Sequence, residues 1–72
     1  MNKVRRKVLE GYISQLEEIK EAIECEMEDE DEKREGMISE EMKEISEEAS
    51  DNMQSAIDSI EEALDYLSSA AE

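Results

Sequence analysis

Two series of apolar residues with helical spacing constrain the fold of this chain more than any other feature. The first series runs from Val4 to Met27 and the second from Ile38 to Ala71, in steps of three and four residues. This spacing places the apolar side chains on one face of an α-helix. The sequence therefore predicts two amphipathic helices, over about residues 3–33 and about residues 38–70.

A short bend at about residues 34–37 is predicted between the two helices. Gly36 is typical of a helix C-terminus, where glycine adopts a left-handed conformation. Lys33 and Arg34 suit the negative end of the helix dipole, and Ser39 can cap the second helix. Because the two apolar stripes match in length, we expect residues 1–72 to form one all-α domain, an antiparallel, coiled-coil-like helical hairpin.

Folding the chain at this bend also predicts which residues face each other. The predicted neighbours are Met27 with Met42, Ile23 with Ile45, Leu16 with Met53, and Leu9 with Leu64.

The second series is irregular between Ile45 and Met53, where two steps of four follow each other. Such an extra step locally unwinds a supercoil, and it coincides with Ser50-Asp51-Asn52, which favour helix N-caps over helix interiors. Two outcomes are open: one continuous helix kinked near residue 51, or two helices that meet there. The lack of proline and glycine favours the continuous helix.

The apolar stripes are wider than the contact between two helices requires. Two hairpins that pack into a four-helix bundle would cover the remaining apolar surface. The alternative is a monomer that docks this surface onto another protein. The residues predicted for the oligomer interface are Leu9, Tyr12, Ile13, Leu16, Ile57, Ile60 and Leu64.

The charge of the chain is large and unevenly distributed. The formal net charge is −15. Residues 1–20 carry five basic and three acidic side chains, whereas residues 21–48 carry three basic and fourteen acidic ones, a net charge of −11. Nucleic acids and anionic membranes attract basic surfaces, so neither is an expected ligand. The expected partner is a basic protein.

The residues present argue against an enzyme. The chain has no histidine and one cysteine, which excludes histidine acid–base chemistry, serine–histidine triads and an internal disulfide. If Gly36 marked a calcium loop, Lys33 and Met42 would occupy positions that need oxygen ligands. We therefore expect no metal site and no cofactor, and an inert, exposed thiol at Cys25. No apolar run approaches the roughly 18 residues that span a bilayer, so a cytoplasmic protein is expected.

Carboxylates repeat every three or four residues along the outward side of both predicted helices. Neighbours at this spacing lie about 5–6 Å apart, a density that resembles a phosphate backbone. Such a surface could occupy a protein that binds nucleic acid, or it could serve solubility alone. The predicted partner-binding residues are Glu21, Glu24, Glu28, Asp29, Asp31, Glu32, Glu35, Glu40, Glu41 and Glu44.

The chain resembles small acidic two-helix proteins encoded by phages and prophages of Gram-positive bacteria. The resemblance is carried by RRKVLEGYISQLEEIKEAIE, the central acidic run and SEEASDNMQSAIDSIEEALDYL, and it covers most of the chain. Members often carry an NMP-type turn, where this chain has Gly36-Met37-Ile38. The resemblance implies a phage protein in the host cytoplasm, and small acidic phage proteins often inhibit host defences, some by mimicking DNA.

Three hypotheses for function follow. The leading one is a non-enzymatic, DNA-mimicking inhibitor of a CRISPR effector or restriction enzyme. The alternative is a structural coiled-coil module that recognises its partner through the apolar stripe. The third, a nucleotide-sequestering oligomer that uses Arg5-Arg6-Lys7, is disfavoured by the negative charge.

Overall fold

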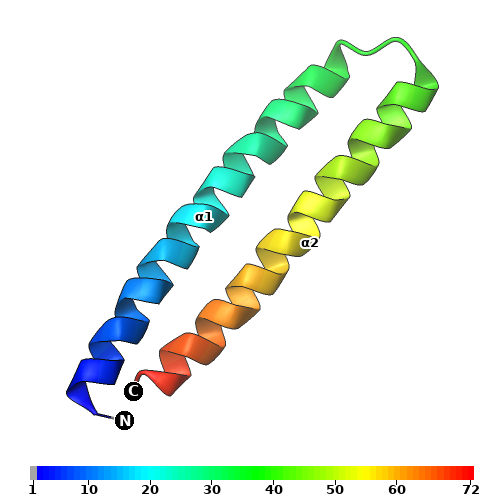
Figure 1. The fold of residues 1–72 in the computed structure, drawn as a ribbon. Coiled ribbons are helices and arrows are strands. Elements are labelled where there is room, and N and C mark those ends of the chain that lie inside the picture. The colour runs from blue at the N-terminus through cyan, green and yellow to red at the C-terminus, as the bar shows by residue number, and fades with distance from the viewer. Residues whose placement is uncertain (1) are drawn as a thin grey trace.

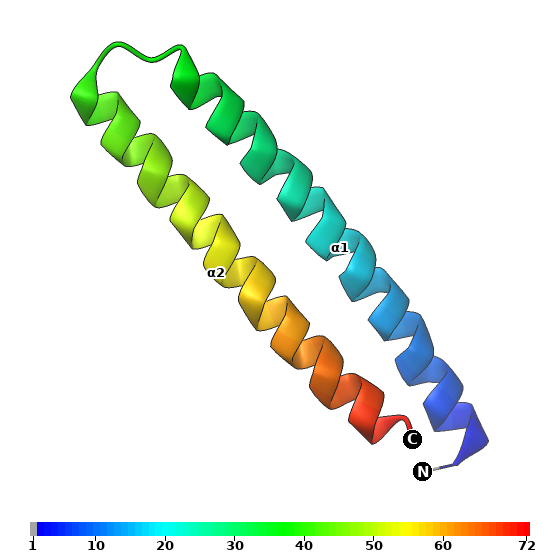
Figure 2. The same cartoon turned by 180° about the vertical axis from the view of Figure 1, so that it is seen from behind.

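The chain folds into two long α-helices that lie side by side and run in opposite directions (Figure 1). The computed structural model describes residues 2–72. Helix α1 spans Lys3–Glu35, helix α2 spans Glu40–Ala70, and residues 36–39 connect them. The result is a rod with extents of 56 × 14 × 10 Å, with both chain ends opposite the connection (Figure 2). The predicted all-α antiparallel hairpin is confirmed.

Each helix begins at a capping side chain. The backbone N–H of Arg5 donates to Oδ1 of Asn2 over 2.8 Å, and the backbone N–H of Met42 donates to Oγ of Ser39 over 3.4 Å. Each bond satisfies one of the amide donors that the first helical turn leaves unpaired. The predicted cap at Ser39 is confirmed, and Asn2 is a second cap that the apolar pattern does not reveal.

Gly36 ends α1 as predicted, but it does not adopt the predicted left-handed conformation. Its φ and ψ angles are −88° and −2°, and no residue within 2–72 has a positive φ. The chain instead leaves α1 through right-handed turns, in which the N–H of Gly36 donates to the carbonyl of Lys33 and that of Met37 to the carbonyl of Arg34. The bend lies at residues 36–39, two residues later than predicted.

The side chains between the two helices follow a regular seven-residue repeat in both α1 and α2. This contact is named the seam, and all its members are buried or half-buried. Its alternating steps of three and four residues are those of a coiled coil. The seam consists of Leu9, Ile13, Leu16, Lys20, Ile23, Met27, Glu30, Arg34 and Met37 on one side, and Lys43, Ser46, Ser50, Met53, Ile57, Ile60, Leu64, Leu67 and Ala71 on the other.

Helix α2 continues without a break through Ser50-Asp51-Asn52, and Figures 1 and 2 show no kink there. The predicted continuous helix is confirmed, whereas the kink predicted near residue 51 and the predicted irregularity of the seam are wrong. The residues that suggested the irregularity lie outside the seam: Ile38, Met42 and Ile45 are 94%, 57% and 62% exposed. Ser50 takes the place in the seam that the prediction gives to its neighbour Ala49.

The pairing of the two helices also differs from the predicted one. Nζ of Lys20 lies 3.6 Å from a carboxylate oxygen of Glu61. If Leu16 lay near Met53, the partner of Lys20 would be about three helical turns earlier in α2. The predicted neighbour pairs are wrong because they rest on the assumption that the apolar residues at the start of α2 lie inside.

Candidate functional site

The seam leaves one free flank on each side of the hairpin, and the two flanks differ in chemistry. Because α1 and α2 run antiparallel, equivalent heptad positions of the two helices lie on the same side of the hairpin. One side is here named the apolar face and the opposite side the acidic face. Each face is built from residues of both α1 and α2.

The apolar face gathers the exposed large hydrophobic residues of helices α1 and α2. Those residues are between 47% and 76% exposed, so the hairpin itself does not cover them. The apolar face consists of Val4 (at its edge), Val8, Tyr12, Ile19 and Ala22 of α1, and Met42, Ile45, Ala49, Ala56, Ala63, Tyr66 and Ala70 of α2. Glu26 and Asp29 are its only carboxylates within residues 2–72.

The acidic face carries fourteen of the chain's 23 acidic residues. All fourteen are exposed except Glu24 and Asp31, which are half-buried. They are Glu10, Glu17, Glu21, Glu24, Glu28, Asp31 and Glu35 of α1, and Glu40, Glu44, Glu47, Asp51, Asp58, Glu61 and Asp65 of α2.

Most of the predicted partner-binding residues are brought together by the fold. Seven lie on the acidic face: Glu21, Glu24, Glu28, Asp31, Glu35, Glu40 and Glu44. Glu32 and Glu41 lie on the outer edges of the hairpin, and Asp29 lies on the apolar face.

The residues predicted for an oligomer interface lie mainly in the seam, where the two helices cover each other. These are Leu9, Ile13, Leu16, Ile57, Ile60 and Leu64. Ile57 is 2% exposed and has no surface left for a second chain, whereas Tyr12 is 52% exposed on the apolar face. An oligomer stays a prediction, and the surface that remains for it is the apolar face.

A polar cluster crosses the seam near the connection. It consists of Glu30, Asp31, Arg34, Ser46 and Ser50. Arg34 donates from Nη1 to the hydroxyls of Ser46 (3.4 Å) and Ser50 (3.1 Å), and from Nη2 to Asp31 (2.7 Å). Ser46 donates to Glu30 and Ser50 to Asp31, each over 2.8 Å. Within residues 2–72 no buried side-chain nitrogen or oxygen lacks a partner, so the cluster meets the requirement for burying polar groups.

The cluster holds Asp31 in its charged form. The hydrogen bond from Ser50 and then the hydrogen bond and charge of Arg34 lower the pKa of the Asp31 carboxyl below its ordinary value, and burial opposes them. The same hydrogen bonds join α1 to α2 across the seam.

Sequence reasoning missed this cluster, although a signal for it exists. Continuing the regular repeat backwards from Ile57 and Met53 leads to Ser50 and Ser46. The prediction follows the apolar residues instead and places Ile45 in the seam, where the structure has its neighbour Ser46.

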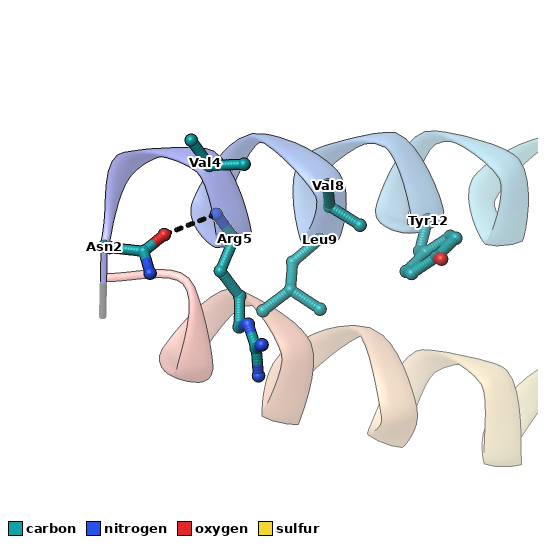
Figure 3. A pocket seen from close by; sticks show the side chains of 6 residues that line it. All are labelled: Asn2, Val4, Arg5, Val8, Leu9 and Tyr12. Atoms are coloured by element: carbon teal, nitrogen blue, oxygen red, sulfur yellow. Dashed lines mark hydrogen bonds between the residues drawn. The ribbon is translucent and has the colours of Figure 1, made fainter.

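The N-terminal end combines a groove with unpaired basic side chains. The groove has a volume of about 430 Å³ and is lined by Asn2, Val4, Arg5, Val8, Leu9 and Tyr12. Figure 3 shows Arg5 extending towards the last turns of α2, while Val4 points away from that helix. The ion pairs within residues 2–72 are Lys20–Glu61, Arg34–Asp31 and Lys43–Glu40, so Lys3, Arg5, Arg6 and Lys7 have none there.

Neither α1 nor α2 has a stretch that is long and apolar enough to cross a membrane. In the described part of the chain, no three acidic or cysteine side chains are grouped so that they could hold a metal ion. The thiol of Cys25 is free and exposed. No family model matches the chain, and neither the curated proteins nor the solved structures include a significant match to it.

Proposed function

We propose that this chain is a non-enzymatic binding protein whose acidic face occupies a basic, nucleic-acid-binding surface of another protein. The observation that supports the proposal is the gathering of fourteen carboxylates from both helices on one side of a 56 Å rod. Over the two helices together this corresponds to one carboxylate per 4 Å of length, compared with one phosphate per about 3.4 Å along one DNA strand and per about 1.7 Å along the duplex. A basic channel that tracks a phosphate backbone would meet a comparable row of anions.

The biological setting of the proposal comes from the family resemblance. A phage-encoded protein of this kind would inhibit a host defence protein, such as a CRISPR effector or a restriction enzyme, in the host cytoplasm. Inhibition by competition needs no catalytic group, and none of the polar groups described above is arranged for catalysis.

Charge reversal on the two faces tests the proposal. One variant carries Glu21→Lys and Glu28→Lys on the acidic face, and the matched control carries Glu26→Lys and Asp29→Lys on the apolar face of the same helix. Each variant is assayed for competition with labelled duplex DNA on purified CRISPR effectors and restriction endonucleases. Circular dichroism and sedimentation confirm that both variants keep their helicity and record their oligomeric state.

The first variant should lose inhibition and the control should retain most of it, and inhibition by the unchanged protein should weaken as salt rises. Equal inhibition by both variants, or inhibition that salt does not weaken, would contradict the proposal.

The apolar face supports a second candidate function, a structural module that recognises its partner through hydrophobic contact. Contiguous exposed apolar patches mark interaction surfaces in soluble proteins, and the exposed hydrophobic residues of both helices lie on this face. In that case Ile45→Lys or Tyr66→Lys would weaken partner binding more than Glu21→Lys and Glu28→Lys together. The two candidates therefore differ in which face a substitution must alter.

A further inference from the structure

We infer that the groove at the N-terminal end of the hairpin binds a small amphiphilic oxyanion, a molecule that carries a phosphate or carboxylate group on an apolar chain. The groove lies along the first three turns of α1, and its volume of about 430 Å³ falls within the range of about 300–1,000 Å³ that is usual for small-molecule sites. The inference concerns this end of the rod alone. It does not depend on the function proposed for the acidic face.

The groove exists because the facing end of α2 carries small side chains. Figure 3 shows Arg5 and Leu9 directed towards the last turns of α2. The sequence there is Ser68-Ser69-Ala70-Ala71, in which no side chain is large enough to fill the space beside α1. That space is therefore open to a ligand.

The lining of the groove is mainly apolar and accessible to solvent. Val4, Val8 and Tyr12 are 76%, 47% and 52% exposed, and Leu9 is half-buried. An apolar chain that lies against these side chains removes apolar surface of both molecules from water, and the gain rises with the area that is covered. The lining therefore favours the apolar part of the ligand.

Arg5 supplies a cation at the same groove. Within residues 2–72 it has no ion pair, although the chain has 23 acidic side chains. A guanidinium group presents its N–H donors in one plane and can bind two oxygens of a carboxylate or phosphate at once. The oxyanion is therefore placed beside Arg5, with the apolar chain along Val8 and Tyr12.

The charge of this end of the rod also favours an anion. Residues 2–12 and 65–72 have four basic and three acidic side chains, a net charge of +1. Residues 13–64 have four basic and twenty acidic ones, a net charge of −16. Because exposed charges that are more than about 8 Å apart are largely screened at physiological ionic strength, an anion in the groove interacts mainly with the basic end.

A titration followed by amide NMR shifts tests for the ligand. The probe is octyl phosphate below its micelle concentration, and the controls are inorganic phosphate and octyl glucoside, each of which lacks one part of the probe. We expect the probe to shift the amides of residues 2–12 with a dissociation constant of about 1 mM or tighter, and each control to bind more weakly by roughly tenfold. Equal binding of the probe and a control, or no shift up to about 10 mM probe, would overturn the inference.

Two matched pairs of variants test the residues of the groove. Arg5→Gln removes the cation of the groove, whereas Lys7→Gln removes a cation that does not line it. Tyr12→Gln removes part of the apolar lining, whereas Ile19→Gln makes a similar change two turns further along α1. All four side chains are exposed, so each variant should keep its helicity, which circular dichroism checks.

We expect Arg5→Gln and Tyr12→Gln each to weaken binding of octyl phosphate by roughly fivefold or more, and the two controls to weaken it by less than roughly twofold. Equal effects within either pair would overturn the assignment of the groove.

The source of the oxyanion is distinguished by co-sedimentation with vesicles of phosphatidylcholine and phosphatidylglycerol. Binding of octyl phosphate without binding of vesicles assigns a free amphiphile, and binding of both assigns a lipid headgroup. Binding of vesicles without binding of octyl phosphate would overturn the groove as the site.

The acidic-face variant separates this inference from the proposed function. Glu21→Lys with Glu28→Lys should leave binding of octyl phosphate within roughly twofold of the unchanged protein, whereas Arg5→Gln should leave the inhibition assay unchanged. Loss of octyl phosphate binding in the acidic-face variant would contradict the inference. Failure of either proposal therefore leaves the other standing.

Discussion

The guanidinium group of Arg34 donates a hydrogen bond to the hydroxyl of Ser50 across the seam, over 3.1 Å. Arg34 belongs to the last turn of α1, where a cation also suits the helix dipole. If α2 slipped by one repeat towards the connection, Arg34 would face Met53 and Ile57, which have no acceptor for it. A polar pair within the seam can select one register of a coiled coil, and we attribute the observed pairing of the helices to it.

Removing the hydroxyl of Ser50 tests this role. Ser50→Ala deprives Arg34 of an acceptor and Asp31 of a donor, so we expect the free energy of unfolding to fall by about 1–3 kcal/mol. Urea unfolding followed by circular dichroism measures the change. Ser55→Ala, at an exposed position of the same helix, should stay within about 0.5 kcal/mol of the unchanged protein. Similar stability of the two variants would show that the cluster contributes little.

The pH dependence of stability should carry a contribution from Asp31. Since Ser50 and Arg34 lower the pKa of this carboxyl in the folded chain, its contribution is fully present above the unfolded-state pKa. It is lost as the pH falls through the lower folded-state pKa. The other carboxylates repel one another less in acid, so the informative quantity is the difference between the unchanged protein and Asp31→Asn.

We expect Asp31→Asn to be the less stable of the two at about pH 7, with a difference that shrinks as the pH falls below about 4. Urea unfolding of both proteins across this range supplies the measurement. A difference that is constant with pH would mean that the carboxylate charge has no part in the cluster.

Ile57 should be the seam residue most sensitive to truncation, because it is 2% exposed. Ile57→Ala removes buried methyl groups and leaves a cavity, which should lower the free energy of unfolding by about 2–5 kcal/mol. The thermal midpoint and the urea midpoint both report this loss. Ser59→Ala, at an exposed position of the same helix, is the control, with an expected change within about 0.5 kcal/mol.

The two glycines should both tolerate alanine. Gly11 lies inside α1 with no atom within 4 Å of the added Cβ, and the Cβ at Gly36 would meet only the Lys33 carbonyl oxygen, at 3.7 Å. Gly11→Ala should stabilise the protein by about 0.5–1 kcal/mol through helix propensity. Gly36→Ala should be neutral or stabilising, because φ at Gly36 is −88°. A large loss of thermal stability in Gly36→Ala would show that this residue needs a left-handed conformation in solution.

Much of the local structure could be predicted because it depends on neighbours in the chain. The steps of three and four residues predict α1 and α2 to within about two residues of their ends. Gly36 marks the end of α1, and Ser39 supplies the cap of α2. The predicted left-handed conformation of Gly36 is wrong, because the chain leaves α1 through right-handed turns.

The candidate faces were only partly predictable. Carboxylates at helical spacing indicate an acidic surface, and most of the residues chosen for it do lie together. The apolar face went unrecognised, because Met42 and Ile45 have the spacing and chemistry of core residues. Met42 and Ile45 are exposed because the seam passes through Ser46 and Ser50 instead.

By itself, the sequence determined two long amphipathic helices, the place where the chain turns, and the large negative charge of the half near the connection. Only the tertiary structure decided how α2 is rotated and which residues of α1 it meets. The physical reason is that hydrophobicity alone favours Ile45 inside over Ser46. Burial of the serines becomes acceptable when Arg34, Asp31 and Glu30 arrive from the other helix to bond them. The bonded residues lie 12 to 19 positions apart on two different helices, and the repeat that leads to Ser50 and Ser46 does not show which residues of α1 meet them.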